Sequence, residues 1–418
     1  MAEAEKGLIS TRNDELCAQP LRKWSGIFEK FENPPWPNWK RLPNTMELIQ
    51  WKLTKSNINL PPDRKELNKT LPIETPRWEM GQVPERCLKA TWIGHATVVV
   101  QMDGVTVITD PIWSERCSPI FFYGPKRYRP APCTIDQLPK IDIAVISHNH
   151  YDHLDKASVK HLNARFGKNL HWFVPMRLAA WMRSVGCETV TELTWGQKAE
   201  VAAPGSSHTV EVTCLPSQHW SMRGPLMDMN KTLWGSWAIK GPHHSFFFAG
   251  DTGYTPEYGR VGQNFGPFDL AAIPIGCYEP RWFMSNQHTD PAGSVKIHKD
   301  VRATRSLGIH WGTFDMGSTE FYLEPKTLLA EEVKKANLSA DCFEARDIGK
   351  TWDLTKNTTV LVSNADKGDG HSALESTGDG SAAMESTGDA YPALETTGDA
   401  SPALENTGDT SPALESNL

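Results

Sequence analysis

Residues 147–155 of the chain read SHNHYDHLD, directly after the apolar run IDIAVI at residues 141–146. The apolar run has the length and the branched side chains of a buried strand, so the polar stretch should lie where that strand ends. Residues two apart point to the same side of an extended or turning backbone. His148 and His150 can therefore bind one ion while Asp152 and His153 turn toward a second. The stretch predicts a metal site; the alternative is a polar loop that is rich in histidine.

Three more apolar segments are followed by a potential ligand. His219 follows VEVTCLPSQ, Asp251 follows HSFFFAG, and His310 follows RSLGI. Neutral imidazoles and carboxylates are the donors that zinc prefers. If His219 joins His148 and His150 while His310 joins Asp152 and His153, each of two ions has three protein ligands, and Asp251 can bridge them. Two metals about 3.5 to 4 Å apart can share a water and convert it to hydroxide near neutral pH.

Strand-like and helix-like segments alternate through residues 86–360, and this region is the predicted catalytic domain. Its strands are short apolar runs such as GVTVITD and HWFVP, and its helices, such as KASVKHLNARF and PKTLLAEEVKKA, have apolar residues at spacings of three and four. Strands outnumber helices, and both are spread along the region. The pattern predicts an α/β fold of layered sheets covered by helices rather than a helix bundle.

The two ends of the chain differ from this region. Residues 1–85 are rich in proline and aromatic residues, as in FENPPWPNWKRLP, and are expected to pack on the core as an arm. A second reading places some of these tryptophans at a bilayer interface, where Trp is favoured. Residues 361–418 contain a decapeptide repeat of the type GDASPALENT, with few apolar residues. A disordered acidic tail is therefore expected there.

Charge and cysteine content restrict the function classes. The formal charge of −7 includes ten acidic residues and no Lys or Arg at residues 368–418, which leaves +3 for the rest of the chain, too little to indicate nucleic-acid binding. The eight cysteines are scattered without a CxxC pair, and the N-terminus does not resemble a signal peptide, so we expect reduced thiols in a cytosolic chain. No apolar run approaches the roughly 20 residues that span a bilayer. Any membrane contact should be peripheral.

The residues also carry a family resemblance. A HxHxDH motif followed by a distant His, an Asp in a GD pair and a last His resembles the metallo-β-lactamase superfamily, whose αβ/βα sandwich has two central mixed sheets flanked by helices. Longer blocks resemble the family of N-acylphosphatidylethanolamine-hydrolysing phospholipases D over about residues 20 to 355. These blocks include TWIGHATVVVQMDGVTVITDPIWSERCSP, GPKRYRPAPCTIDQLPKID, FFFAGDTGY, FGPFDLAAIPIGCYEPRWFM, QHTDP and IHWGTF.

The resemblance implies residue roles and cofactors. Two zinc ions per chain are expected, one held by His148, His150 and His219 and the other by Asp152, His153 and His310, with Asp251 bridging as a ligand and catalytic residue. Tyr151 and His288 match positions that contact the substrate phosphate. His288 is the candidate for positioning the phosphate or protonating the leaving group, and the alternative is a structural histidine. His95 and Asp110 are expected to support the site without binding metal.

The function implied is a zinc-dependent phospholipase D-type phosphodiesterase that hydrolyses N-acylphosphatidylethanolamine to N-acylethanolamine and phosphatidic acid. The expected partners are a membrane phospholipid, a membrane surface and a second copy in a homodimer. The expected location is the cytosolic face of intracellular membranes, of the Golgi or endosomes. The loop of Phe121, Phe122 and Tyr123, followed by Lys126, Arg127 and Arg129, is suited to headgroup contact, unless it is simply a solvated loop.

Other functions remain open at this stage. One is a lactonase or phosphodiesterase of the same fold that acts on a small soluble substrate. Another is a binding or scaffold protein on an inactive hydrolase fold, but that reading predicts a lost ligand and all seven are present. A nuclease would need a concentrated basic groove, which the sequence does not indicate. A diiron oxygen reductase would favour Glu where His150 stands, so the motif favours zinc.

Overall fold

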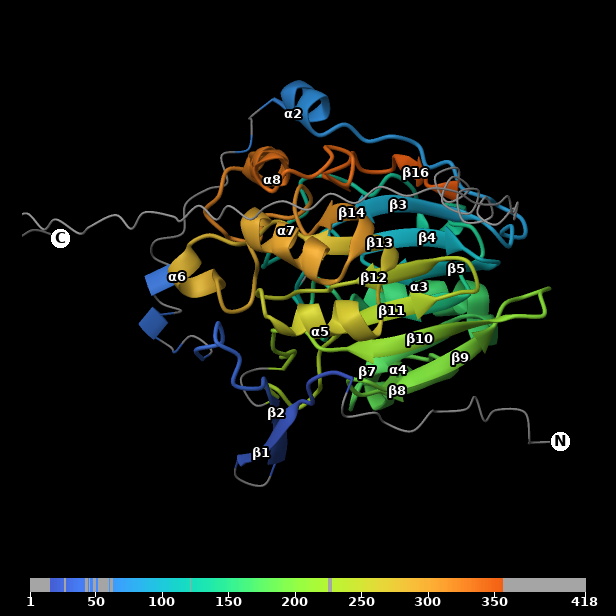
Figure 1. Ribbon diagram of the computed structural model, residues 1–418, viewed down its shortest axis with the longest axis horizontal. Coiled ribbons are helices and arrows are strands. Elements are labelled where there is room, and N and C mark those ends of the chain that lie inside the picture. The colour runs from blue at the N-terminus through green and yellow to red at the C-terminus, as the bar shows by residue number, and fades with distance from the viewer. Residues whose placement is uncertain are drawn as a thin grey trace, which may run out of the picture. The chain divides into compact units, whose positions relative to one another are not determined.

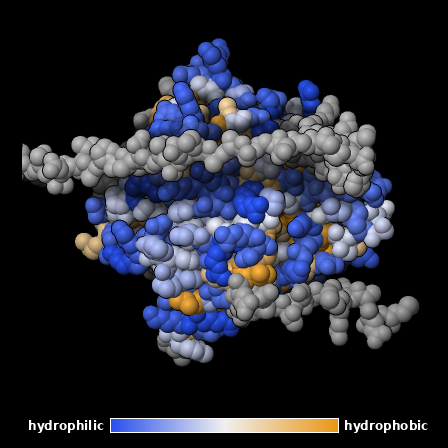
Figure 2. All heavy atoms as spheres, viewed as in Figure 1, coloured by the Kyte–Doolittle hydropathy of each residue, from blue (hydrophilic) through white to orange (hydrophobic). Residues whose placement is uncertain are grey.

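The computed structural model describes residues 16–355, except for residues 26–27, 42–43, 45, 48–49, 52–59, 61–62, 121 and 225–227. The predicted disordered tail, residues 361–418, lies outside the described residues. No helix among the described residues is long and apolar enough to cross a membrane. Figure 2 shows that the described residues on the face seen in Figure 1 are mostly hydrophilic, with apolar residues in small separate patches.

Two seven-stranded mixed sheets form the centre of the fold (Figure 1). The first sheet has the order β16-β3-β4-β5-β6-β7-β8, with strands at Thr351–Asp353, Leu88–Gly94, Thr97–Met102, Val105–Thr109, Ile143–Val145, His171–Pro175 and Thr189–Leu193. The second has the order β15-β14-β13-β12-β11-β10-β9, with strands at Phe343–Glu344, Ala303–Ile309, Phe268–Pro274, Ser245–Phe248, Ser236–Lys240, Thr209–Leu215 and Lys198–Ala202. The predicted α/β fold with two mixed sheets is confirmed.

Helices cover the outer faces of both sheets (Figure 1). The helices α3 (Lys156–Phe166) and α4 (Ala179–Ser184) pack on the first sheet, and α5 (Glu257–Asn264), α7 (Pro291–Asp300) and α8 (Glu324–Lys335) pack on the second. The shorter helices are α2 (Arg64–Thr70), α6 (Arg281–Met284) and the 3-10 turns Ile135–Gln137 and Gly167–Asn169. A two-stranded hairpin of β1 (Leu21–Ser25) and β2 (Phe28–Glu32) precedes the sheets.

The core lies on both faces of the first sheet. Along β4 the side chains of Val98 and Val100 join the apolar cluster between the sheets, while Val99 joins the cluster under α3 and α4. In β6, Val145 and Ala144 divide between the same two clusters. Successive strand residues point to opposite faces, so a strand covered on both sides needs an unbroken apolar run. This requirement explains why IDIAVI, rather than an alternating pattern, precedes the histidine-rich stretch.

Two local predictions from the sequence differ from the structure. The apolar run KATWIGHATVVVQM predicts one strand, but it forms two antiparallel strands, β3 and β4, because the chain turns at His95, whose φ is +52°. Helix α5 is absent from the predicted helices because its sequence, EYGRVGQN, contains two glycines, which are poor helix formers. Gly262 is required by packing, since a Cβ there would lie 1.9 Å from the carbonyl oxygen of Asp300 at the end of α7.

Described parts of the N-terminal 85 residues contact the core, at one point through the predicted ligand His219. The backbone N–H of the buried Phe31 donates to the carbonyl of Asn230 at 2.8 Å. The indole of Trp36 stacks on Trp195 with ring centroids 5.9 Å apart. The amide Nδ2 of Asn33 donates to the carbonyl of His219 at 2.8 Å. The boundaries of the arm, the catalytic domain and the tail at residues 85 and 360 stay predictions.

Candidate metal centre and substrate cavity

The seven predicted metal ligands come from the carboxyl ends of four strands. Strand β6 leads into the loop that carries the HxHxDH motif. Strands β10, β12 and β14 run in one direction within the second sheet, and each is followed within four residues by its predicted ligand. Because parallel strands end at the same edge of a sheet, these separate segments meet. The ligands are His148, His150, Asp152, His153, His219, Asp251 and His310.

Three of these histidines form one cluster. The Nε2 atom of His148 lies 2.7 Å from Nδ1 of His150, and Nε2 of His219 lies 3.3 Å from the same atom. His148 and His219 are buried and His150 is half-buried. Three ring nitrogens that converge within 4.8 Å of one another form a suitable three-nitrogen site for one cation.

A second cluster contains a carboxylate. The Oδ2 atom of Asp152 lies 3.2 Å from Nε2 of His153 and 3.5 Å from Nε2 of His310. All three side chains are buried. This mixed oxygen and nitrogen set could hold a second cation.

Asp251 lies between the two clusters. Its Oδ2 atom is 3.0 Å from Nε2 of His153, 3.8 Å from Nε2 of His219 and 4.0 Å from Nε2 of His148. The preceding Gly250 has a φ of +61°, and a Cβ there would lie 2.5 Å from the Cβ of Ser147. Glycine is therefore needed to bring the end of β12 against the histidine-rich loop.

The electrostatics of the clusters fit bound cations. Burial lowers the pKa of His150 to about 4 and holds the pKa values of His148 and His219 well below their usual value. Burial also opposes charge on His310, but the carboxylates of Asp251 and Asp152 outweigh it and raise its pKa to about 9. The first cluster therefore offers neutral nitrogen donors, and the second offers the negative charge of a carboxylate.

Orphaned polar atoms provide a second indication that the residues fit a metal. The Nε2 atom of His310 and the Oδ1 atom of Asp251 are buried and make no hydrogen bond with any residue that the structure describes. Buried polar atoms without partners are costly, and a cation between them would satisfy both. The buried His and Asp cluster is thus a metal-binding site in its chemistry and geometry.

Outer residues orient the ligands. The Oδ2 atom of Asp110 accepts a hydrogen bond from Nδ1 of His153 at 2.7 Å, and His95 contacts Oδ2 of Asp152 through Nε2 at 2.9 Å. The main-chain carbonyl of Gln287 lies 3.1 Å from Nδ1 of His219. Such contacts fix which ring nitrogen faces the metal. His95 and Asp110 thus lie where their expected supporting roles require. The contact from Gln287 was missed because a carbonyl leaves no signal in a sequence.

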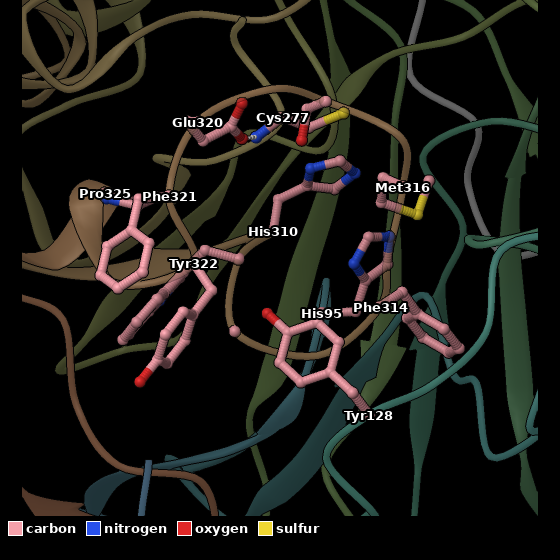
Figure 3. A pocket seen from close by; sticks show the side chains of 13 residues that line it. His95, Tyr128, Cys277, His310, Phe314, Met316, Glu320, Phe321, Tyr322 and Pro325 are labelled. Carbon is pink, nitrogen blue, oxygen red and sulfur yellow. Dashed lines mark hydrogen bonds between the residues drawn. The ribbon is translucent and has the colours of Figure 1, made fainter. Parts of the chain in front are cut away.

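His310 also borders a second, small cavity (Figure 3). The cavity has a volume of about 30 Å³, room for a water molecule, and its walls include Tyr128, Cys277 and Glu320. The Nδ1 atom of His310 has no hydrogen-bond partner among the described residues. The Glu320 carboxylate accepts from the backbone N–H of Cys277 at 2.6 Å, which ties the 277–279 turn to this wall.

A larger cavity of about 750 Å³ opens over the metal ligands. His150, Asp152, His219 and Asp251 form part of its floor. Its other walls are mainly apolar and rich in methionine and aromatic side chains, namely Met222, Met229, Met284, Met316, Trp51, Trp220 and Phe283. Unbranched methionine side chains adapt to ligands of varied shape. The cavity therefore suits a molecule with flexible apolar chains and one polar group that reaches the metal ligands.

The two predicted substrate contacts both line this cavity. The Nδ1 atom of His288 lies 3.9 Å from Oδ2 of Asp251 and has no hydrogen-bond partner among the described residues. The hydroxyl of Tyr151 donates to the carbonyl of Arg223 at 2.9 Å. His288 is thus free to donate to a ligand, whereas the Tyr151 hydroxyl must turn from Arg223 before it can donate to one.

The expectation for the loop after Phe122 needs a correction. Arg127 donates from Nη2 to the carbonyl of Ile112 at 2.8 Å, and Arg129 is buried and donates to Oδ1 of Asn68 at 2.7 Å. Both guanidinium groups are engaged in hydrogen bonds within the fold, so neither is available to contact a lipid headgroup. Backbone carbonyls compete for arginine donors, and the sequence does not reveal which arginines they take.

Comparisons with known proteins agree with this site. A family model described as "Beta-lactamase superfamily domain" matches residues 105–311. The chain is 44% identical over 352 residues to N-acyl-phosphatidylethanolamine-hydrolyzing phospholipase D 1 of Caenorhabditis elegans, covering 82% of this chain and 96% of that protein. It is 32% identical to a yeast N-acyl-phosphatidylethanolamine-hydrolyzing phospholipase D named as mitochondrial, covering 70% and 68% of the two chains. An uncharacterized protein of Mycobacterium tuberculosis is 38% identical, with 64% and 68% covered.

The two mixed sheets, the matched domain and the buried His and Asp cluster define a metal-dependent hydrolase of the metallo-β-lactamase type. Within that class, the chain belongs to the family of N-acyl-phosphatidylethanolamine-hydrolyzing phospholipases D.

Proposed function

We propose that the chain is a zinc-dependent phospholipase D-type phosphodiesterase that hydrolyses N-acylphosphatidylethanolamine to N-acylethanolamine and phosphatidic acid. The observation that carries the proposal is the apolar cavity whose floor is the buried His and Asp cluster. A phospholipid diester matches this arrangement, because its flexible acyl chains suit the apolar walls and its anionic phosphate suits the polar floor. The family relationship to enzymes named for this reaction supports the same substrate class.

Two zinc ions are proposed, one in each cluster. His148, His150 and His219 would hold the first, Asp152, His153 and His310 the second, and Asp251 would serve both. Zinc bound there would lower the pKa of a water and stabilise charge on the phosphoryl oxygens. The chain's own part is to keep the donors unprotonated, to hold Asp251 between them, and to exclude bulk water with the methionine and aromatic walls.

His288 and Tyr151 are proposed to position the phosphate. His288 presents an unpartnered Nδ1 atom beside Asp251, so it can donate a hydrogen bond to a phosphoryl oxygen or a proton to the departing alkoxide. Tyr151 could add a second donor if its hydroxyl leaves the carbonyl of Arg223. Water adds to phosphorus, the bond from phosphorus to the ethanolamine oxygen breaks, and one proton goes to that oxygen.

Peripheral contact with a membrane is part of the proposal. Phe122 and Tyr123 are 69% and 65% exposed, and their loop contributes Cys117, Pro119 and Pro125 to the cavity wall. Trp282, 48% exposed, lies on α6, whose Phe283 and Met284 also line the cavity. Exposed aromatic side chains on two segments beside one cavity suit contact with a bilayer surface.

The homodimer and the cytosolic face of Golgi or endosomal membranes are proposed from the family resemblance. The name of the yeast relative describes it as mitochondrial, so the family relationship does not by itself fix the organelle. A hydrolase of a small soluble substrate remains the alternative. Sedimentation with liposomes separates the two, because a soluble-substrate enzyme should stay in the supernatant.

The test is to incubate the purified full chain, with zinc, with vesicles that contain N-acylphosphatidylethanolamine and to identify the products by mass spectrometry. Wild type should release N-acylethanolamine and phosphatidic acid in equal amounts. Asp251→Ala should release neither, and the exposed variant Met80→Ala serves as the control that keeps wild-type activity. Absence of N-acylethanolamine from wild type, or undiminished release by Asp251→Ala, would contradict the proposal.

A further inference from the structure

A second cleft lies next to the substrate cavity. It has a volume of about 600 Å³ and shares Pro119, Tyr151 and Arg223 with the cavity as common walls. The rest of its lining comes from the 114–118 segment, the start of α3, and Trp181 on α4. None of the seven proposed metal ligands lines this cleft.

The lining of the cleft is basic. Its charged side chains are Arg116, Lys156, Lys160, Arg223 and the single acid Asp155. The Asp155 carboxylate already accepts hydrogen bonds from the hydroxyls of Ser114 and Ser158 and from the N-terminal backbone of α3. Four cations thus face one carboxylate that is engaged with the protein, and the cleft should attract anions.

Among the described residues, the two lysines of this lining have no partner that would neutralise them. Lys156 and Lys160 are exposed and four residues apart on α3, so their side chains lie on the same side of the helix. Neither ammonium makes a hydrogen bond or an ion pair with a residue in the part of the chain that the structure describes. An anion in the cleft could be bound by both.

Arg223 is held in a fixed position between the cleft and the cavity. Its Nη1 atom donates to the carbonyls of Leu154 at 2.7 Å and Asn149 at 3.2 Å. Its guanidinium lies over the rings of Tyr151 and Trp181, 4.2 and 4.7 Å from their centroids. No described residue takes a hydrogen bond from its Nε or Nη2 atoms, so a preoriented edge of this guanidinium remains for a ligand.

We propose that this cleft is a second phosphate site, which binds a phosphate monoester. The inference rests on the proposed function and deepens it. Hydrolysis converts a diester with one negative charge into a monoester whose second ionisation has a pKa of about 6, so the product is nearly dianionic at neutral pH. A lining of four cations and one engaged carboxylate favours the dianion over the monoanion. The acidic product can therefore leave the metal ligands for the neighbouring cleft while its chains stay in the apolar cavity.

The ligand chemistry is a phosphate monoester, and it could come from phosphatidic acid or from free phosphate. Isothermal titration calorimetry on the zinc-loaded full chain can compare dioctanoyl phosphatidic acid, inorganic phosphate and dioctanoyl phosphatidylglycerol, a diester with a single charge. We expect the phosphatidic acid to bind about tenfold more tightly than the phosphatidylglycerol. Equal affinities for these two lipids would overturn the proposal.

Variants assign the binding to the cleft. Lys156→Ala with Lys160→Ala should weaken phosphatidic acid binding about tenfold, and Lys156→Arg with Lys160→Arg should restore it. The matched control is Lys65→Ala with Lys69→Ala, because these lysines are also exposed and four apart, on α2. The control should bind as wild type does. Unchanged binding by the Lys156 and Lys160 alanine variant would contradict the proposal.

The remaining comparisons identify the source of the phosphate. If inorganic phosphate binds with the same dependence on Lys156 and Lys160, the cleft recognises the phosphate group alone. If only phosphatidic acid binds in this way, the chains in the adjoining cavity add to the affinity. Both results support a monoester site. Because binding is measured without turnover, a chain that binds phosphatidic acid but releases no N-acylethanolamine would refute the proposed function and leave the site standing.

Discussion

The Oδ1 atom of Asp251 lies 3.1 Å from the Nε2 atom of His310, yet neither atom makes a hydrogen bond with a residue that the structure describes. Both atoms are buried, so a bound cation that both of them contact would satisfy them. The contact places the end of β12 beside the end of β14, and Asp251 Oδ2 also lies 3.8 Å from Nε2 of His219, so Asp251 stands between the two clusters of predicted ligands. Several expectations follow from it.

Replacement of the Asp251 carboxylate should release metal. Asp251→Asn keeps the shape of the side chain but removes the negative charge that balances His153 and His310. We expect the zinc content to fall from two to one or fewer per chain, and kcat/KM to fall by at least about 100-fold. Inductively coupled plasma mass spectrometry on the dialysed protein gives the zinc content. A variant that retains two zincs and full activity would contradict the bridging position.

The support that Asp110 gives to His153 should be measurable as metal affinity. Asp110→Asn removes the charged acceptor for Nδ1 of His153, and loss of such an outer contact weakens metal binding by about 10 to 100-fold. Competition with a chromophoric chelator measures the affinity. Asp142→Asn is the matched control. Asp142 is also buried, but its carboxylate accepts a hydrogen bond from the backbone N–H of Thr106 in β5 and not from a predicted ligand. Equal zinc affinity of the two variants would refute a supporting role for Asp110.

The apolar cavity should set the preference for acyl chains. Met222→Trp places a larger, stiffer side chain in the wall, so we expect kcat/KM for substrates with long N-acyl chains to fall about tenfold and that for short chains to fall less. Initial rates with a series of chain lengths test this. Met80→Trp, at an exposed position, should behave as wild type does. An equal loss at every chain length would indicate general damage instead of a chain-length limit.

Membrane contact should depend on the exposed aromatic residues beside the cavity. Phe122→Ser together with Trp282→Ser removes two apolar side chains that we place at the bilayer surface, and the partition coefficient onto vesicles should fall about tenfold. Co-sedimentation with liposomes measures the partition. Met80→Ser is the control for loss of an exposed apolar side chain elsewhere. Wild-type partitioning of the double variant would place the contact surface on another part of the chain.

Acid should destabilise the fold partly through His171. Burial lowers the pKa of His171, at the start of β7, to about 4, and its Nε2 atom lies 2.7 Å from the hydroxyl of Thr191. An unfolded histidine has a pKa of about 6.5, so the unfolded chain binds more protons below that pH. The contribution of His171 is therefore present above pH 6.5 and is lost as the pH falls toward 4.

The corresponding measurement is the free energy of unfolding in urea between pH 7 and 4.5. Its slope should be reduced in His171→Gln by up to about 1.4 kcal/mol per pH unit relative to wild type. Met80→Gln, which changes an exposed side chain that does not titrate, is the control and should keep the wild-type slope. If His171→Gln keeps the wild-type slope, His171 has the same pKa in the folded and the unfolded chain, which would contradict the prediction.

The clustering of the predicted ligands could be predicted from the sequence because each of them follows an apolar strand. His219, Asp251 and His310 lie far apart in the sequence, but a polar donor after a buried run marks a strand end, and parallel strands end together. The geometry that places His95 was not predictable. A positive φ at His95 breaks an apparently continuous strand, and non-glycine residues adopt that conformation only where the surrounding structure imposes it.

The surface chemistry was harder to predict than the metal centre. Arg127 and Arg129 appear basic and exposed in the sequence, but backbone carbonyls and Asn68 take their donors inside the fold. Exposed cations near the cavity include Lys156 and Lys160 on α3, a helix that begins directly after the SHNHYDHLD stretch. Which of two cations is buried depends on the three-dimensional arrangement of acceptors, and periodicity carries no information on that arrangement.

The central claim is that water attacks phosphorus in a lipid diester at the His and Asp cluster. Hydrolysis of N-acylphosphatidylethanolamine vesicles in water enriched in oxygen-18, followed by mass spectrometry of both products, tests it directly. We expect one heavy oxygen in the phosphatidic acid and none in the N-acylethanolamine, with no product from Asp251→Asn. Heavy oxygen in the N-acylethanolamine, or equal product from that variant, would contradict it.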